Sequence, residues 1–258
     1  AISLGSNSDT FLSTLAFYGD VKCFSLTKDP LPMEIERMVA TLDSFDVVII
    51  GIHHKDVAEK TIQRLGRNKY RILAFFTSPY ALDNFRNLIH ESTACILGYE
   101  NRSTLQSLSA QAIFGGISTS GKLPVTIAEL FHKDTGLTLK KSRLGYGLPE
   151  GVGISSEKLQ QIDSIALNAI KKGMMPGCQI LVAKNGTVIY QRSFGYQDST
   201  KQQAVKNTDL YDIASLTKIS ATLPSLMKLY DENRFELNKK IATYLPDLRH
   251  TNKNQLVI

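Results

Sequence analysis

Residues 46–52 read DVVIIGI and residues 70–77 read YRILAFFT, two short runs that are apolar almost throughout. Strands that helices cover on both faces carry continuous apolar runs of this kind, whereas half-exposed strands alternate apolar and polar residues. We therefore predict that both runs are central strands of a parallel sheet.

Segments typical of strands and of helices alternate around these two runs. Further strands are predicted at 2–4, 21–26 and 93–99, and helices at 11–18, 33–42, 55–65, 80–89 and 103–114. The spacing of apolar residues from Ile35 to Leu42 is that of an amphipathic helix, and Gly115 can end the last helix in a left-handed conformation. Repeated strand–helix units with right-handed crossovers predict an α/β fold, a doubly wound and mostly parallel sheet in an α/β sandwich.

The composition is that of an ordinary folded protein. The chain has 258 residues, of which 43% are hydrophobic and 21% charged, and this length corresponds to one or two domains. Its apolar runs fall short of the roughly 18–20 residues that cross a bilayer, so no membrane span is expected. The first nine residues show no signal peptide. A mature or cut chain would also lack one, so these residues do not assign the protein to a cellular compartment.

The cysteines and the charge distribution bear on metals and nucleic acids. Cys23, Cys95 and Cys178 show no C-x-x-C spacing, so we expect small buried hydrophobic residues rather than zinc ligands or a disulfide framework. The net charge of +6 divides into +1 for residues 1–150 and +5 for residues 151–258. These positive residues are scattered without interleaved aromatics, so a nucleic-acid partner is not expected.

No motif for a cofactor is visible. The strands are not followed by the glycine patterns that cradle phosphates, so nucleotide binding is not expected. His53 and His54 follow the third predicted strand, but neighbours in extended chain point in opposite directions, and the pair is interpreted as part of a loop. A weaker alternative is that this loop touches a ligand held by another domain. We therefore predict neither a metal nor a cofactor.

The second half begins with a glycine-rich segment. Residues 140–153 are rich in glycine and are interpreted as a linker or domain boundary. A helix is predicted to begin after Ser155, which can cap it, and to end at Gly173. Two β runs at 178–184 and 187–193 are joined by Asn185-Gly186, a dipeptide that favours a type I′ hairpin turn.

Residues 211–218, which read YDIASLTK, carry the pattern most typical of catalysis. Ser215 and Lys218 lie three residues apart, so a helix would place both on one face, with the amine able to accept the hydroxyl proton. We expect burial among apolar neighbours and the positive helix N-terminus to lower the pKa of Lys218, and first-turn N–H groups to help bind an oxyanion. The alternative is a capping serine beside a surface lysine.

Four stretches of the first half carry a family resemblance. They read YRILAFFTSPYAL (70–82), ACILGYEN (94–101), AQAIFGG (110–116) and SGKLPVTI (120–127). They resemble the C-terminal α/β sandwich domain of bacterial glycoside hydrolase family 3, of the β-N-acetylglucosaminidase type. The resemblance implies a domain at 1–147 and a preceding catalytic barrel, and it carries no glycosidase catalytic residue over to this sequence.

Three stretches of the second half resemble another family. GCQILVAKNG (177–186), YDIASLTK (211–218) and LNKKIATYLP (237–246) are similar to the N-terminal part of serine β-lactamase-like hydrolases, the superfamily of class C β-lactamases and penicillin-binding proteins. This resemblance implies a truncated domain at 148–258, with Ser215 as the acylated nucleophile and Lys218 as its activating partner. The family's Y-x-N or S-x-N and K-T-G or H-x-G motifs are not found. Lys184-Asn185-Gly186 looks like K-T-G but precedes Ser215 in a hairpin turn, and we reject it.

Together these observations predict a fragment of a bacterial bifunctional hydrolase. It would join a β-N-acetylglucosaminidase to a β-lactamase-related serine hydrolase, act on cell-wall or amino-sugar glycosides and on acyl or peptide bonds, and show little turnover by itself. The resemblance implies the periplasm or cell surface, with three partners: a small-molecule or peptidoglycan-like substrate, the missing remainder of the chain, and a second copy covering apolar faces. The alternative is a non-catalytic docking module that recognises peptidoglycan-like ligands.

Overall fold

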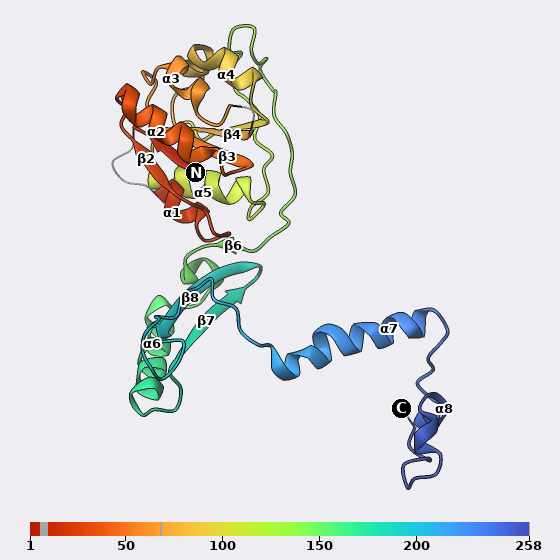
Figure 1. The fold of residues 1–258 in the computed structure, drawn as a ribbon. Coiled ribbons are helices and arrows are strands. Elements are labelled where there is room, and N and C mark those ends of the chain that lie inside the picture. The colour runs from red at the N-terminus through yellow and green to blue at the C-terminus, as the bar shows by residue number, and fades with distance from the viewer. Residues whose placement is uncertain (6–9, 68, 258) are drawn as a thin grey trace. The chain divides into compact units, whose positions relative to one another are not determined.

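The computed structural model describes residues 1–5, 10–67 and 69–257 (Figure 1). These residues form two compact units, Ala1–Thr208 and Asp209–Ile258, and each unit is described by itself.

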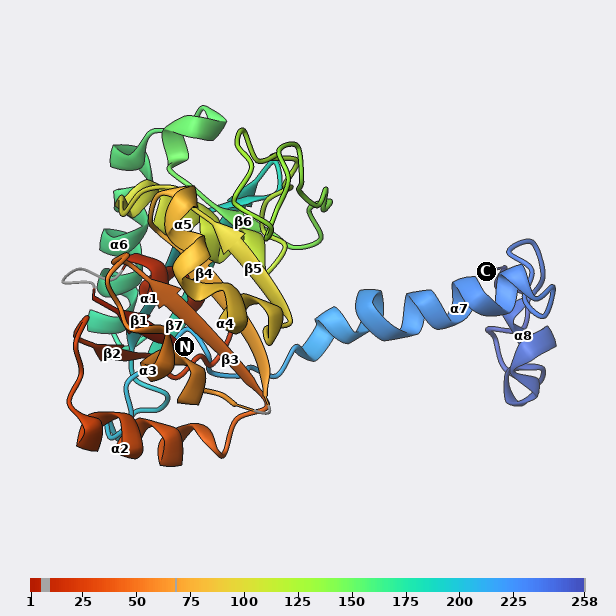
Figure 2. The same ribbon diagram turned by 90° about the horizontal axis from the view of Figure 1, so that it is seen from above.

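A parallel five-stranded sheet organises the first unit (Figure 2). Its strands are β1 (Ile2–Leu4), β2 (Phe24–Leu26), β3 (Val47–Ile52), β4 (Tyr70–Phe75) and β5 (Ala94–Leu97). They lie in the order β2-β1-β3-β4-β5, and every neighbouring pair is parallel. The prediction of an α/β fold with a mostly parallel sheet is therefore confirmed, with the two apolar runs in its central strands β3 and β4.

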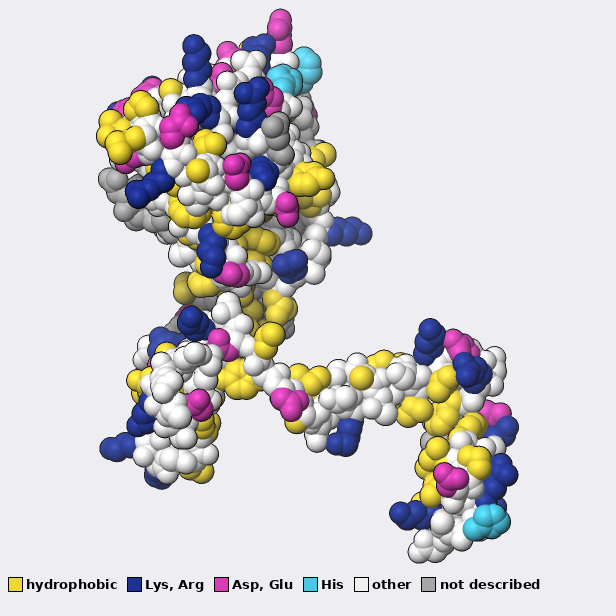
Figure 3. Space-filling view, in the orientation of Figure 1, with side chains coloured by type: hydrophobic (Ala, Val, Ile, Leu, Met, Phe, Trp, Pro, Cys, Tyr) yellow, Lys and Arg dark blue, Asp and Glu magenta, His cyan; other side chains and the backbone are white. Residues whose placement is uncertain are grey.

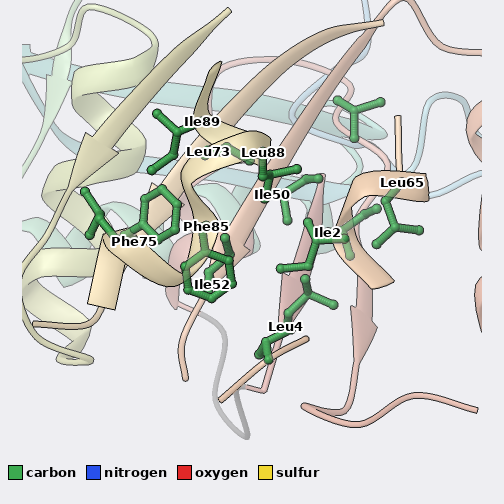
Figure 4. Packing of buried hydrophobic residues seen from close by; sticks show 14 of the residues in the cluster. Ile2, Leu4, Ile50, Ile52, Leu65, Leu73, Phe75, Phe85, Leu88 and Ile89 are labelled. Atoms are coloured by element: carbon green, nitrogen blue, oxygen red, sulfur yellow. The ribbon is translucent and has the colours of Figure 1, made fainter. Parts of the chain in front are cut away.

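Helices cover the sheet on both faces. Successive residues of β3 show this, because Ile49 packs in one cluster of buried apolar side chains and Ile50 in the other. Figure 4 shows the larger cluster, in which Phe75 and Phe85 pack together. The smaller cluster is formed with α1 (Thr10–Leu15) and α5 (Ser103–Ile113), and the larger with α2 (Pro32–Leu42), α3 (Glu59–Arg64), the 3-10 turn η1 (Pro79–Phe85) and α4 (Arg86–His90).

Two details of the helices differ from the sequence analysis or sharpen it. The helix predicted at 80–89 is a 3-10 turn followed by the short helix α4, and residues Asp83 and Asn84, poor helix formers, lie in that turn. Helix α5 ends as predicted, with Gly115 in the left-handed region at φ 74°.

The prediction that the cysteines are buried is wrong. Cys23 and Cys95 are exposed, Cys178 is half-buried, and all three are free thiols. Cys95 lies on β5 and Cys23 immediately precedes β2, the two edge strands of the sheet. An edge strand has a neighbour on one side alone, so an apolar-looking run there does not guarantee burial.

A second, three-stranded sheet follows in the same unit, in the order β6-β8-β7. The antiparallel strands β7 (Gly177–Lys184) and β8 (Thr187–Gly195) confirm the predicted hairpin. Its turn has Asn185 at φ 52° and Gly186 at φ 73°, the positive values that a type I′ turn requires. Helix α6 (Ser156–Lys171) packs on β8, and the Ser155 side chain caps it by accepting a hydrogen bond from Lys158 N.

The segment interpreted as a linker is partly ordered as a strand. Within it, β6 (Gly145–Tyr146) pairs in parallel with β8, and Gly145 N donates to Gly186 O at 3.0 Å. Gly147 N donates to Val188 O at 3.1 Å. A Cβ at Gly145 would lie 2.8 Å from Gly116 O, so this glycine serves close backbone approach rather than flexibility. The domain boundary at 147/148 stays a prediction.

Four aromatic side chains attach β6 to the sandwich, and we call them the aromatic junction: Phe17, Tyr18, Phe114 and Tyr146. The ring of Tyr146 stacks on Phe17 with centroids 4.8 Å apart and meets Tyr18 edge-on at 5.2 Å, while Tyr18 stacks on Phe114 at 5.0 Å. Tyr146 Oη donates to Phe17 O at 2.9 Å, and Tyr146 N donates to Gln111 Oε1 at 2.8 Å. Burial raises the pKa of Tyr18 to about 12.

The second unit contains short helical elements. They are the 3-10 turn η3 (Ala214–Leu216), the π-helical turn η4 (Lys218–Thr222), α7 (Leu223–Asp231), α8 (Ile241–Tyr244) and the 3-10 turn η5 (Pro246–Leu248). Across the described ranges, no helix combines the length and apolar character needed to cross a membrane.

Candidate active site

The pair Ser215 and Lys218 lies where a 3-10 turn passes into a wider helical turn. Ser215 is in η3, and Lys218 begins η4, in which Leu223 N donates to Lys218 O five residues earlier. Pro224 explains the wide turn, because proline has no N–H to donate and its ring clashes with the carbonyl four residues before it. The predicted helix is therefore present, but it is not a continuous α-helix.

The structure brings the two predicted site residues together. Lys218 Nζ donates a hydrogen bond to Ser215 Oγ at 3.0 Å. The separation of three residues places both side chains on one face, as the sequence predicts. An amine at this distance can take the hydroxyl proton when the lysine is in its neutral form.

The residues just before Ser215 form a tight turn. Ala214 adopts a left-handed conformation at φ 42°, which is uncommon for a residue with a Cβ. Asp212 Oδ1 accepts a hydrogen bond from Ala214 N at 2.8 Å. The N–H groups of Leu216 and Thr217 donate to carbonyls within the turn. The N–H of Ser215 is the remaining amide of this turn that an oxyanion could use.

The expected burial of the pair is not found. Ser215 and Lys218 are both exposed. The apolar neighbours Ile213, Leu216 and Ile219 are exposed by 50%, 58% and 64%. Within residues 209–257 the main contacts of η3 and η4 are with one another and with α7, the continuation of the same helical segment. Figure 3 shows the hydrophobic side chains, in yellow, at the surface of the segment that contains α7.

The other motifs considered in the sequence lie away from this pair in the chain. Lys184-Asn185-Gly186 forms the β7–β8 turn in the first unit, in keeping with its rejection as a K-T-G motif. His53 is buried at the end of β3, where its Nδ1 lies 2.8 Å from Asn101 Oδ1. His54 is partly exposed beside Asp56, so the two histidines have different environments. Among the described residues no group of three or more His, Cys, Asp or Glu is placed to hold a metal ion.

Sequence reasoning missed three features of the site. The left-handed Ala214 gave no signal, because alanine is not a residue that favours positive φ. Asp212 did offer one, since an aspartate two residues before such a position commonly accepts the backbone N–H of a turn. The proline in the helical run was likewise a signal for the irregular turn.

Comparisons with known proteins agree with the second resemblance. Residues 162–257 match the family model described as Beta-lactamase. "Protein flp" of Staphylococcus aureus (strain NCTC 8325 / PS 47) is 36% identical over 96 residues, which are 37% of this chain and 19% of the relative. A "Putative D-alanyl-D-alanine carboxypeptidase" of Salmonella agona (strain SL483) is 33% identical over 109 residues, 39% of this chain and 25% of the relative. The chain thus spans a quarter or less of these relatives, and residues 162–257 are similar to β-lactamase-like proteins.

Proposed function

We propose that Ser215 is the nucleophile of a serine hydrolase and that Lys218 is its base. The observation that supports this most directly is the 3.0 Å separation of Lys218 Nζ and Ser215 Oγ. Neutral Lys218 accepts the hydroxyl proton while Oγ forms a bond to the carbonyl carbon of the substrate. The bond to the leaving group then breaks, the leaving group departs with that proton, and water hydrolyses the acyl–serine ester.

The substrate we propose is a peptide, ester or β-lactam-like acyl group of cell-wall type. Support comes from the Salmonella relative, which is named a putative D-alanyl-D-alanine carboxypeptidase. The same relative suggests an envelope location, and we propose the periplasm or cell surface. Cell fractionation with an antibody to this chain tests the location.

For residues 1–147 we propose the C-terminal sandwich module of a family 3 β-N-acetylglucosaminidase, joined to the hydrolase in one longer bifunctional protein. The parallel sheet and the SGKLPVTI stretch support this proposal. In the structure Ile127, at the end of that stretch, is 1% exposed and packs in the larger apolar cluster. Release of nitrophenol from 4-nitrophenyl N-acetyl-β-glucosaminide by the full-length protein is the expected result, and no release would contradict the glycosidase assignment.

Covalent labelling tests the serine hydrolase assignment. The full-length protein is treated with a fluorescent penicillin and separately with a fluorophosphonate, and labelling is expected to disappear in Ser215→Ala. Ser220→Ala is the matched control, because Ser220 lies in the same helical segment and its Oγ donates to Leu216 O at 2.9 Å. Equal labelling of Ser215→Ala would refute the nucleophile assignment. Binding of muropeptides without labelling would instead favour the alternative of a non-catalytic recognition module.

A further inference from the structure

We propose that Asp212 is a positioning residue for Ser215. Its carboxylate holds Ala214 in the left-handed conformation and thereby sets the direction from which Ser215 Oγ meets Lys218 Nζ. This inference rests on the proposed function and deepens it, because it assigns to the same site a residue that does not touch the substrate.

The turn before the nucleophile is held in a conformation that its residue type disfavours. Ala214 has φ 42°, and for an L-residue with a Cβ this region is sterically costly. The preceding residue Ile213 is ordinary, at φ −79° and ψ −7°, and neither Ser215 nor Leu216 is among the residues with positive φ. The unfavourable geometry is therefore confined to the position directly before Ser215. Conformations of this kind persist where the surroundings hold them.

The hydrogen bond from Ala214 N to Asp212 Oδ1 supplies that restraint. Its length of 2.8 Å is that of a strong bond to a carboxylate. The partner is the amide of the left-handed residue itself, so the bond acts directly at the disfavoured φ. A second bond, from Leu216 N to Ile213 O at 2.8 Å, closes the turn around Ser215.

The geometry links this restraint to the reactive pair. Lys218 belongs to the helical segment that runs through α7, so its backbone position is fixed from the C-terminal side. The position of Ser215 is fixed from the other side, through Ala214. If Ala214 relaxes to negative φ, the direction of the chain entering Ser215 changes. The 3.0 Å approach of Ser215 Oγ to Lys218 Nζ is then lost or weakened.

The test measures the rate at which a fluorophosphonate labels Ser215 in the full-length protein. Asp212→Ala is expected to slow labelling at least about tenfold. Asp212→Asn keeps an oxygen acceptor and is expected to label within about threefold of the wild-type rate. In the double variant Asp212→Ala/Ala214→Gly, glycine adopts positive φ without the Cβ penalty and is expected to recover much of the lost rate. Asp231→Ala, at the C-terminal residue of α7, is the matched control and is expected to label at the wild-type rate.

The outcomes separate this inference from the proposed function. Wild-type labelling at Ser215 together with an undiminished rate in Asp212→Ala overturns the positioning role and leaves the nucleophile assignment in place. No labelling of the wild type at Ser215 overturns both. Where Asp212→Ala fails to fold, as judged by circular dichroism, the Asn variant decides: a tenfold loss despite its acceptor oxygen contradicts the proposal, and a retained rate supports it.

Discussion

Replacing Tyr146 by alanine is expected to release β6 from the sandwich while both sheets stay folded. The change removes one hydrogen bond, from Tyr146 Oη to Phe17 O at 2.9 Å, and two ring contacts, with Phe17 at 4.8 Å and Tyr18 at 5.2 Å. A hydrogen bond contributes about 1 kcal/mol and an aromatic pair about 0.5–1.5 kcal/mol. Their sum lowers the free energy of opening the aromatic junction by about 2–4 kcal/mol.

Native-state hydrogen exchange is the assay, read at the backbone amide of residue 146, which donates to Gln111 Oε1 of the sandwich at 2.8 Å. A loss of 2–4 kcal/mol corresponds to exchange that is roughly 30- to 700-fold faster. Tyr146→Phe removes the hydroxyl alone, about 1 kcal/mol, and is expected to accelerate exchange roughly fivefold. The matched control is Tyr80→Ala, because Tyr80 is 64% exposed on η1 and its loss is expected to leave exchange at this amide unchanged.

Two results would refute this reasoning. Acceleration below about threefold in Tyr146→Ala would mean that the ring contacts do not hold β6 in place. Equal acceleration at Ile50 and Leu73, in the central strands, would mean that the substitution destabilises the whole unit rather than the junction.

Three further predictions concern stability, each measured by urea unfolding of the full chain. The Arg71 guanidinium is 2% exposed, donates to the buried carbonyl of Leu65 and pairs with Glu91 at 3.2 Å. Arg71→Ala is therefore expected to lower the free energy of unfolding by about 2–5 kcal/mol, and Glu91→Ala, at the exposed end of the pair, by less than about 1 kcal/mol. Equal losses in the two variants would contradict this account. Burial raises the pKa of Tyr18 to about 12, so the folded state keeps a phenolic proton that the unfolded state loses near pH 10. The free energy of unfolding should therefore fall as the pH rises from 10 to 12, and it should fall less in Tyr18→Phe. An equal fall in both proteins would contradict this prediction. The Ser155 side chain caps α6 by accepting a hydrogen bond from Lys158 N, and Ser155→Ala is expected to lower the free energy of unfolding by about 1 kcal/mol or less. Ser156→Ala is the comparison within the same turn. No loss of stability relative to Ser156→Ala would mean that the cap does not stabilise the protein.

Much of the fold could be predicted because its signals are local. A continuous apolar run such as 46–52 indicates a strand that is covered on both faces, and β3 is such a strand. Asn185-Gly186 specifies its turn through the positive φ that both residues tolerate. The approach of Ser215 to Lys218 also depends mainly on spacing along one segment, so it too was visible in the sequence.

The features that were missed depend on contacts distant in the chain or on a choice between two roles of one residue. Glycine marks flexible linkers and close backbone packing alike, and Gly145 takes the second role because Gly116 O lies in the way of any side chain. Burial of Lys218 requires a layer packed across its helix, and spacing along the helix says nothing of such a layer. Cys95 was predicted to be buried for a related reason, since the apolar residues around it do not reveal that β5 is an edge strand.

The pairing of β6 with β8 has a consequence for the order of folding. Translation delivers residues 145–146 before residues 187–195, and N-terminal parts of a chain generally fold first during synthesis. We expect β6 to be anchored against the sandwich when the hairpin emerges, and to present an edge with unpaired backbone groups. On this expectation the folded sandwich provides the strand against which the second sheet is assembled during synthesis.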